Sequence, residues 1–171
     1  MDDIVRQALL KWPDVPDCRG WLHLTRRGAW RVPTGIIHHA GLSAFIGRNY
    51  GADETGRWFF QNGPQKVFVS LEYTPYVLRL RSDGSLETHT GLPVDALQAG
   101  WLDDDGSLLL DSEHGIGLLD DRDLAAMAEG LEGNPDSAEP LHLRWRDTRV
   151  SIGRLKRAEV SARFGFLAEP T

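Results

Sequence analysis

The chain has 171 residues, of which 41% are hydrophobic and 26% are charged, and its formal net charge is −6. These values are ordinary for a globular protein and exclude a disordered or fibrous chain. A chain of this length buries about 70% of its unfolded surface, so it needs no disulfide or metal to complete a core. The length predicts one domain, residues 1–171.

The chain carries the features of a soluble cytoplasmic protein. Its single cysteine, Cys18, allows no internal disulfide, which fits a reducing compartment. The start, Met1-Asp2-Asp3, is acidic and lacks the basic and apolar regions of a signal peptide. No apolar run approaches the roughly 18 residues that span a bilayer. We therefore expect a cytoplasmic location and no membrane partner.

Charge is unevenly distributed along the chain. Residues 95–139 contain 13 acidic side chains and one basic one, whereas residues 141–163 contain seven basic and two acidic ones. The first interpretation is that the two segments neutralise each other in the fold or face solvent separately. The alternative is that the basic segment binds an anion, a nucleic acid or an acidic partner. The negative net charge weighs against nucleic acid as a partner.

The first half of the chain reads as a helix, a hairpin, a second helix and further strands. Apolar spacing predicts an N-terminal helix over residues 2–11 and another helix near residues 36–48. Residues 21–24 and 29–32 read as a hairpin around Gly28. In residues 67–73 the apolar side chains alternate, which predicts a strand with Val67, Val69 and Leu71 on its core face.

An internal repeat separates the chain into two β units. Asp53-Glu54-Thr55-Gly56 followed by Arg57-Trp58-Phe59-Phe60 matches Asp103-Asp104-Asp105-Gly106 followed by Ser107-Leu108-Leu109-Leu110, fifty positions further along the chain. The match predicts a duplicated turn–strand–turn–strand unit, although any two hairpins share some likeness. We place the first β unit at about residues 20–90, the second at about 91–155 and a C-terminal tail at 156–171.

The fold class predicted is α+β, a single β-rich domain of antiparallel hairpins with two repeated β units and a helix near residues 36–48 packed on one face. Short connections leave little room for the crossovers that parallel strands require. A short helix at residues 123–131 and a last hairpin at residues 141–152 complete the pattern.

No motif indicates a catalytic residue, a metal or a cofactor. The six histidines lack the helical spacing of zinc ligands, and His38 and His39 are adjacent and point apart. The acidic run before Gly106 departs from a calcium loop, because Trp101 and Ser112 occupy its first and last ligand positions. Gly115-Ile116-Gly117 lacks the third glycine of a dinucleotide fingerprint.

Polar residues that interrupt apolar segments are the candidate ligand-binding residues. One interpretation pairs Arg48 with Glu72 as a structural ion pair. The other places polar and aromatic side chains around a small-molecule pocket floored by aromatic rings. The side chains of this predicted pocket are Arg48, Asn49, Trp58, Phe60, Gln61, Glu72 and Tyr76.

Residues 20–91 resemble bacterial, mostly proteobacterial, families described only as domains of unknown function. The resemblance rests on Gly20-Trp21-Leu22 through Arg27-Gly28-Ala29-Trp30, on Arg57-Trp58-Phe59-Phe60 and on Leu71-Glu72-Tyr73-Thr74-Pro75-Tyr76. Tyr73 stands where related families have an acid. The resemblance implies a mixed fold with repeated β units and a ligand-binding or signalling role, and it implies no catalytic residue.

Three functions fit these observations. The first is a regulatory module that binds a small molecule or a protein partner. The second is a homo-oligomeric interaction protein that uses Trp12, Trp21 or Trp101. The third is a small enzyme whose site combines distant residues, such as Glu72 with His38 or His39 as an acid–base pair.

Overall fold

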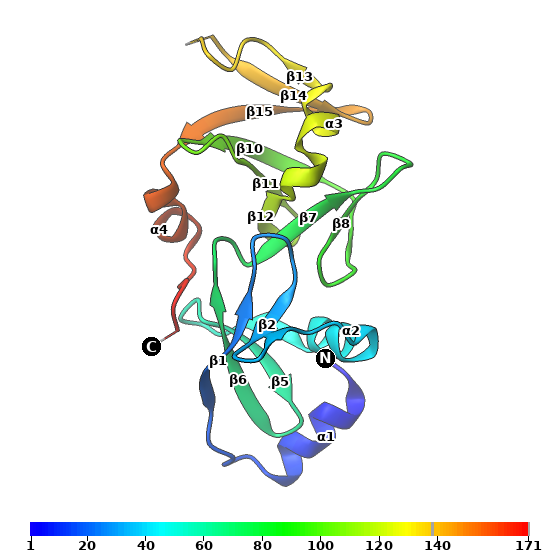
Figure 1. Cartoon of the computed structure of the whole chain (residues 1–171), viewed down its shortest axis with the longest axis vertical. Helices are drawn as coiled ribbons and strands as arrows, with labels where there is room; N and C mark the ends of the chain where they lie inside the picture. The colour runs from blue at the N-terminus through cyan, green and yellow to red at the C-terminus, as the bar shows by residue number, and fades with distance from the viewer. Residues whose placement is uncertain (138, 171) are drawn as a thin grey trace. The chain divides into compact units, whose positions relative to one another are not determined.

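The computed structural model describes residues 1–137 and 139–170, and the chain divides into two compact units. Unit 1 comprises residues 1–75 together with 164–171, and unit 2 comprises residues 76–163. Each unit contains one sheet (Figure 1). The prediction that residues 1–171 form a single domain stays a prediction; Ala138 and Thr171, which that range and the predicted 156–171 tail include, lie outside the described residues.

The sheet of unit 1 (sheet 1) has six strands in the order β3-β2-β1-β6-β5-β4. The neighbours β1 and β6 run parallel, and all other pairs are antiparallel. Two three-stranded meanders, β1–β3 and β4–β6, are thus joined along one parallel seam. The strands are β1 (Cys18–Leu24), β2 (Trp30–Val32), β3 (Gly35–Ile36), β4 (Tyr50–Ala52), β5 (Trp58–Asn62) and β6 (Gln65–Leu71).

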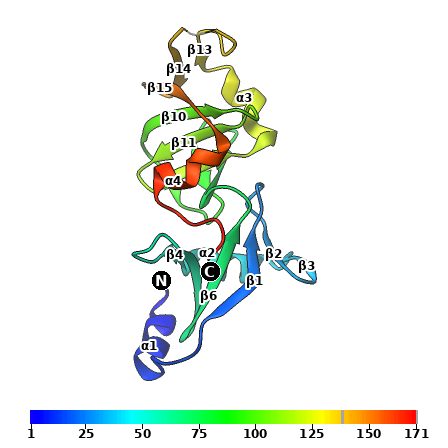
Figure 2. The same cartoon turned by 90° about the vertical axis from the view of Figure 1, so that its left-hand side faces the viewer.

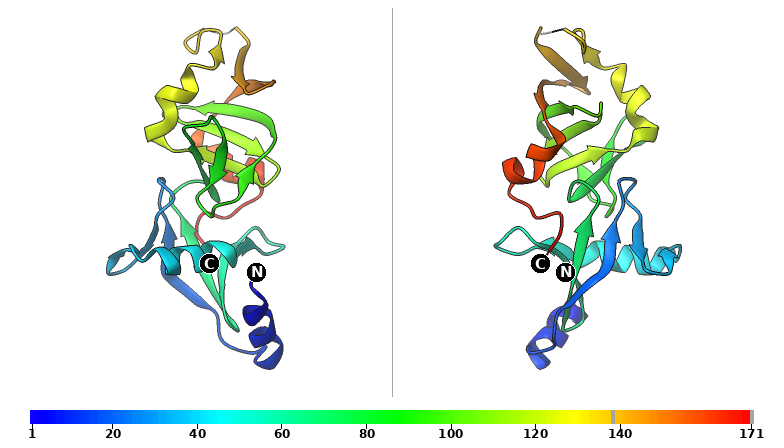
Figure 3. Two further views of the ribbon diagram at one scale, coloured as in Figure 1. Left: turned by 90° about the vertical axis from the view of Figure 1, so that its right-hand side faces the viewer. Right: turned by 60° about the vertical axis from the view of Figure 1, so that its left-hand side comes forward.

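Helix α2 (Ala40–Arg48) covers one face of sheet 1 (Figures 1 and 3). Its Phe45 ring meets the Phe60 ring of β5 at 5.5 Å. Val67, Val69 and Leu71 are buried on this face, as the alternation predicted. Each fully buried aliphatic or aromatic side chain contributes about 1.5–3 kcal/mol, so this layer is the core of unit 1. Helix α1 (Asp3–Lys11), the predicted N-terminal helix, adds Val5.

The C-terminal segment returns to unit 1 on the opposite face of sheet 1 (Figure 2). It lies between the start of β5 and the end of β6. Leu167 donates its N–H to the Gly56 carbonyl at 2.9 Å, and the Ala168 carbonyl accepts from Leu71 at 2.8 Å. The Ser70 hydroxyl donates to Glu169 at 2.8 Å. Phe166 is buried, so the segment is anchored by a side chain as well as by backbone bonds.

The sheet of unit 2 (sheet 2) has nine strands in the order β13-β14-β15-β10-β11-β12-β7-β8-β9. Two pairs, β7 with β12 and β10 with β15, are parallel. The strands are β7 (Tyr76–Leu80), β8 (Leu86–Thr88), β9 (Pro93–Val94), β10 (Leu97–Asp103), β11 (Leu108–Ser112), β12 (Gly115–Leu119), β13 (Leu131–Glu132), β14 (Leu141–Trp145) and β15 (Thr148–Leu155).

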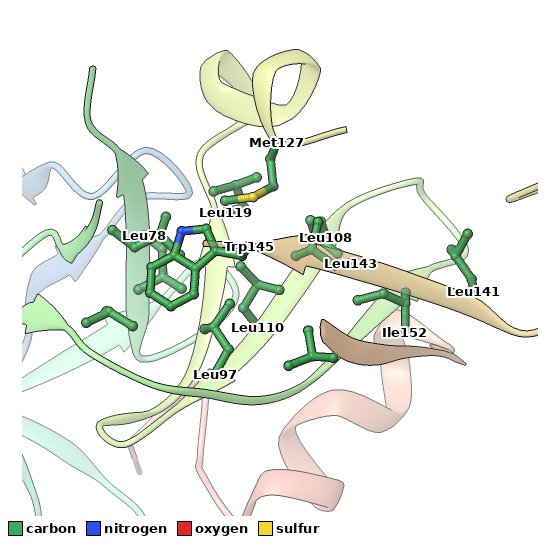
Figure 4. Close-up of a cluster of buried hydrophobic side chains, with 13 residues drawn as sticks. Leu78, Leu97, Leu108, Leu110, Leu119, Met127, Leu141, Leu143, Trp145 and Ile152 are labelled. Carbon is green, nitrogen blue, oxygen red and sulfur yellow. The ribbon is translucent and has the colours of Figure 1, made fainter. Parts of the chain in front are cut away.

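A leucine-rich core lies on one face of sheet 2, under helix α3 (Leu124–Ala128) (Figure 4). Leu78, Leu110 and Leu119 from the central strands belong to the same cluster as Met127 of the helix, which lies next to Leu119. Trp145 lies among these side chains and donates its indole N–H to the Gly84 carbonyl at 2.9 Å. The short 3₁₀ segment η1 (Asp121–Asp123) precedes α3, and a second one, η2 (Arg157–Glu159), follows β15 and leads into α4 (Val160–Phe164).

The predicted repeat is confirmed, and it is longer than the sequence indicated. Strands β5 and β11 begin at Trp58 and Leu108, and β6 and β12 begin at Gln65 and Gly115, so both pairs keep one constant offset. Sheet 2, read from β9 to β10, repeats the strand order of sheet 1, including the central parallel pair. The turns before β5 and β11 also share their bonds: in each, the aspartate N–H donates to the residue four positions later, and the glycine N–H donates back to the aspartate. The six-stranded unit is therefore duplicated.

The α+β class is confirmed, and three details of the prediction are corrected. Parallel pairs occur because the strands that form them are separated by whole meanders, which supply the crossover that short turns cannot. Residues 76–90, assigned to the first β unit, belong to sheet 2. The predicted helix at 36–48 begins only at Ala40, because Gly35 and Ile36 pair with β2 as β3.

The duplicated turn provides a matched test of the C-terminal anchor. Gly56 and Gly106 have φ of +80° and +79°, so an alanine at either costs about 1 kcal/mol of backbone strain. A Cβ at Gly56 would also lie 2.2 Å from the Gly165 carbonyl oxygen, whereas one at Gly106 meets nothing within 4 Å. We expect Gly56→Ala to lower the free energy of unfolding in urea by about 2 kcal/mol more than Gly106→Ala. Limited proteolysis should cut the C-terminal segment only in Gly56→Ala; equal losses in both variants would contradict this role of Gly56.

Candidate functional site

The predicted pocket residues are divided between the two units. Tyr76 opens β7 of unit 2, and the other six side chains belong to unit 1. Within unit 1 they lie on different elements and on both faces of sheet 1; Asn49 and Gln61 bond to backbone, whereas Arg48 and Glu72 form ion pairs. The pocket itself stays a prediction, and the observed partners of each side chain are as follows.

Arg48 and Asn49 join the end of α2 to the start of α1. The Arg48 guanidinium binds the Asp2 carboxylate at 3.1 Å. Asn49 is 2% exposed, its Oδ1 accepts from the Asp2 N–H at 2.7 Å, and its Nδ2 donates to the Phe45 carbonyl at 2.9 Å. These bonds hold the pKa of Asp2 below its usual value, with Arg48 as the main cause. Both side chains thus fasten the N-terminal helix.

Trp58 and Phe60 belong to the aromatic layer beneath α2. The Tyr50 ring lies 4.8 Å from Trp58 and 5.1 Å from Trp30, and its hydroxyl donates to the Pro75 carbonyl at 2.9 Å. Phe60 packs against Phe45. Gln61, on the opposite side of the same strand, is buried and donates to the Gly63 carbonyl at 3.1 Å, which fixes the β5–β6 turn.

The predicted Arg48–Glu72 pair is wrong. Glu72 is exposed, binds Arg31 at 3.2 Å and accepts the Arg26 N–H at 3.0 Å. Arg48 instead meets Asp2, because α1 folds against the end of α2. His39, one of the two histidines proposed as an acid–base partner of Glu72, accepts the Leu42 N–H at 3.1 Å and caps α2.

Tyr76 lies in a small aromatic group of unit 2. Its ring centroid is 5.9 Å from that of His89 and 6.3 Å from that of His114, and burial raises the pKa of its hydroxyl. His89 Nδ1 accepts the Val77 N–H at 3.2 Å, which places the proton of the neutral ring on Nε2. Nε2 is buried, and desolvation lowers the pKa of His89 to about 3. His89 is therefore neutral at physiological pH.

The face of sheet 1 opposite α2 carries cations stacked on aromatic rings. Phe59 and Phe68 are cross-strand partners with centroids 6.2 Å apart. Arg19 lies 4.4 Å and Arg57 4.9 Å from the Phe68 centroid, and Lys66 lies 4.5 Å from Phe59. Phe68 is only 1% exposed, and the stacked cations cover part of its ring. We call Arg19, Arg57, Phe59, Lys66 and Phe68 the cation–aromatic face.

The duplicated strands of sheet 2 carry no cation at the matching positions. The counterparts of Phe59, Lys66 and Phe68 are Leu109, Ile116 and Leu118, all buried. The repeated strand pairing therefore forms without stacked cations. Trp58 and Phe60 form the floor of the pocket predicted from the sequence. Their neighbour Phe59 points to the other face of the sheet, because side chains alternate along a strand.

Unit 2 contains a cavity of about 370 Å³. It lies at the carboxyl ends of the parallel strands β10 and β15, where Leu102 pairs with Arg154 and Asp103 with Leu155. Asp104, Lys156 and Glu159 complete its lining. Ligand sites favour this end of parallel strands because loops and helix starts gather there. No sequence motif marked these residues, since they come from two segments that are far apart along the chain.

Three of the charged lining groups have roles within unit 2. The Arg157 N–H donates to Asp104 at 2.7 Å, which holds the pKa of Asp104 below its usual value. Arg154 donates to the Pro135 and Ser137 carbonyls. Asp103 accepts N–H bonds from Asp105 and Ser107 within its own turn. By contrast, the side chains of Lys156 and Glu159 make no hydrogen bond or salt bridge to another residue in the described part of the chain.

The acidic and basic segments bind each other within unit 2, as the first interpretation of the charge pattern held. Glu132 binds Arg144 at 2.6 Å and Arg149 at 2.7 Å, and Asp105 binds Arg157 at 3.0 Å. The fully buried Asp120 accepts bonds from the backbone and side chain of Arg122, and these bonds lower its pKa to about 2.

The remaining features predicted from composition can be placed as well. Within residues 1–137 and 139–170, no cluster of three His, Cys, Asp or Glu side chains could hold a metal ion. None of the described helices is long and apolar enough to cross a bilayer. Trp12 and Trp21 are 51% and 45% exposed, while Arg163 lies over the Trp101 ring at 5.2 Å. Homo-oligomerisation through these rings stays a prediction.

Comparison with known proteins identifies families of unknown function. The profile of the DUF2944 family, described as "Protein of unknown function (DUF2946)", matches residues 1–171. The resemblance stated for residues 20–91 is thereby confirmed as to unknown function and extended to the whole chain. No protein of curated function matches the sequence.

Two solved structures are similar to this chain. One is a DUF1285 family protein from Silicibacter pomeroyi DSS-3, with a TM-score of 0.57 and 13% identity over 84% of this chain and 85% of that one. The other is a DUF1285 family protein from Shewanella baltica OS155, with a TM-score of 0.48 and 17% identity over 63% of this chain and 90% of that one. Because the sequence identity is so low, the first likeness establishes the fold alone.

The buried His89 predicts how stability depends on pH. The pKa of His89 is about 3 in the folded chain and about 6.5 in the unfolded chain, so only the unfolded state binds a proton between these values. The free energy of unfolding should therefore fall as pH is lowered from 6.5 toward 4.5, by at most about 1.4 kcal/mol per pH unit. His89→Asn keeps an acceptor for the Val77 N–H and should remove this slope. Urea titrations at several pH values measure it, and an unchanged slope in the variant would refute the assignment.

Proposed function

We propose that this chain, which belongs to the DUF2944 family of proteins of unknown function, is a cytoplasmic regulatory module that binds a small zwitterionic molecule in the cavity of unit 2. One observation carries the proposal: the cavity is lined by an ammonium group, Lys156, and a carboxylate, Glu159, that no other described side chain binds. A volume of about 370 Å³ lies within the range of small-molecule sites, roughly 300–1,000 Å³.

The lining favours a ligand with charges of both signs. Lys156 can donate to a carboxylate and Glu159 can accept from an ammonium group, and charge-assisted bonds of this kind are the stronger ones. Asp104 and Arg154 already have hydrogen-bond partners, so they contribute to the electrostatic potential of the cavity but offer fewer free donors and acceptors. Leu102 and Leu155 supply apolar surface. An L-α-amino acid with a small apolar side chain has the matching groups.

The position of the two charged residues would let ligand binding act on the C-terminal part of the chain. Lys156 precedes η2 and Glu159 ends it, and η2 leads directly into α4 and the C-terminal segment. A ligand that bridges the two side chains would hold this stretch in one conformation. Binding to the folded state alone also stabilises it, by about 2.7 kcal/mol at 100 times Kd.

Differential scanning fluorimetry with single L-amino acids tests the proposal. We expect one or more to raise Tm by several degrees, since about 1 kcal/mol shifts Tm by roughly 2–4 °C in a chain of this size. A simple amine and a simple carboxylate, added separately, should have little effect. Lys156→Gln and Glu159→Gln should each abolish the shift.

Matched substitutions outside the cavity serve as controls. Lys11→Gln and Glu129→Gln remove one exposed charge of each sign and should leave the Tm shift intact. The proposal fails if no zwitterion raises Tm, or if the shift persists in both cavity variants.

A further inference from the structure

The cation–aromatic face of unit 1 has a property that surface charge alone does not give. Arg19 and Lys66 both lie near the Phe68 ring, with their charged groups 4.4 and 5.8 Å from its centroid. An aromatic ring attracts a cation through its π face and uses none of its N–H donors. The rings thus position two cations while leaving their hydrogen-bonding capacity for another molecule.

The donors of these two cations are available. The guanidinium of Arg57, the third cation, forms a salt bridge with the Asp53 carboxylate at 2.9 Å. Among the described residues, the Arg19 guanidinium forms a long salt bridge with Asp17, at 3.7 Å, and this distance is beyond hydrogen-bonding range, so its N–H donors stay available. The Lys66 ammonium makes no hydrogen bond or salt bridge to any residue in the described ranges. The Arg19 side chain is 40% exposed, so a solute can reach it.

The charge of the pair matches a phosphate monoester. Such a group carries about −1.5 to −2 at neutral pH. Arg19 and Lys66 carry two positive charges against the one carboxylate of Asp17, so the site keeps a positive charge, and a doubly charged phosphate is attracted to it more strongly than a singly charged carboxylate. The planar guanidinium of Arg19 also fits phosphate oxygens in a two-pronged arrangement.

Trp21 supplies a neighbouring aromatic surface. It lies two residues after Arg19 on β1 and is 45% exposed. Trp21 precedes Leu22, which is buried beside Val69, so Trp21 points to the face opposite α2. Arg19 lies over the Phe68 ring of that same face, on the other side of a bulge in β1. An exposed indole beside an anion site can stack on a flat group attached to the phosphate.

Two comparisons within the chain support a binding role. The matching positions of sheet 2 carry Ile116 for Lys66 and Leu118 for Phe68, so the duplicated strands pair without these cations. The negative net charge also belongs to unit 2, since unit 1 contains nine basic and eight acidic side chains. The net charge of unit 1 therefore does not repel anions.

We infer that the cation–aromatic face binds the phosphate of a soluble aromatic phosphate monoester through Arg19 and Lys66, with its ring on Trp21. This site is separate from the cavity of unit 2, and the inference does not depend on the proposed function.

Titration of the full chain with phenyl phosphate, inorganic phosphate and benzoate tests the site, with calorimetry for Kd and ¹H–¹⁵N spectra for location. Phenyl phosphate should bind most tightly and benzoate least. Arg19→Gln and Lys66→Gln should each weaken phenyl phosphate by about tenfold to 100-fold, the size expected for a lost charged hydrogen bond. Trp21→Ala should reduce phenyl phosphate to the affinity of inorganic phosphate.

Lys11→Gln is the matched control, because Lys11 also stacks on an aromatic ring, 4.5 Å from Trp12, but has no second cation on that ring among the described residues. It should leave all affinities unchanged. If a site variant unfolds, the wild-type spectra decide: the amide signals around Arg19, Trp21 and Lys66 must shift on titration. Equal weakening by Lys11→Gln, tighter binding of benzoate, shifts elsewhere, or binding only to anionic lipid vesicles would each overturn the inference.

Discussion

The parallel pairing of β1 with β6 is the constraint on which unit 1 depends. It places residues 18–24 beside residues 67–71, so segments that are distant along the chain share one surface. Because side chains alternate along each strand, the pairing of Leu22 with Val69 turns both side chains into the core on the α2 side. A shift of register between Cys18 and Leu22 separates this stretch from Arg19, which lies over the Phe68 ring on the other face, as Lys66 does. A one-residue slip of β1 would turn Leu22 out of the core.

The same seam recurs between β7 and β12, and the duplication shows how one strand scheme accommodates different surfaces. In unit 1 one face receives α2, and the other carries stacked cations and the C-terminal segment. In unit 2 the positions equivalent to Phe59 and Phe68 are buried leucines, and three further strands extend the sheet beyond β10. The repeated glycine turns keep the same backbone hydrogen bonds, so the side chains were free to differ between copies.

Charge is organised by unit rather than by the chain as a whole. The acidic surplus lies in unit 2, where basic residues 144–157 neutralise part of it through short ion pairs. Such pairs are mostly exposed and contribute little stability individually. Lys156 and Glu159, which line the cavity, take no part in these pairs. Unit 1 is close to electrical neutrality. The local charge of each unit therefore differs from the net charge of the chain.

Alternation and glycine turns are local signals, and they predicted the α+β class, the N-terminal helix, most strands, the Val67–Val69–Leu71 core face and the internal repeat. The charge pattern left open whether the acidic and basic segments meet. The folded structure was needed to show that Arg48 binds Asp2 and Glu72 binds Arg31, that Asn49 and Gln61 bond to backbone, and that β7 and β8 belong to the second sheet. The cavity of unit 2 and the cation–aromatic face were equally invisible in sequence. Each is assembled from segments that are distant along the chain, and parallel pairing between distant strands leaves no periodic trace in the sequence.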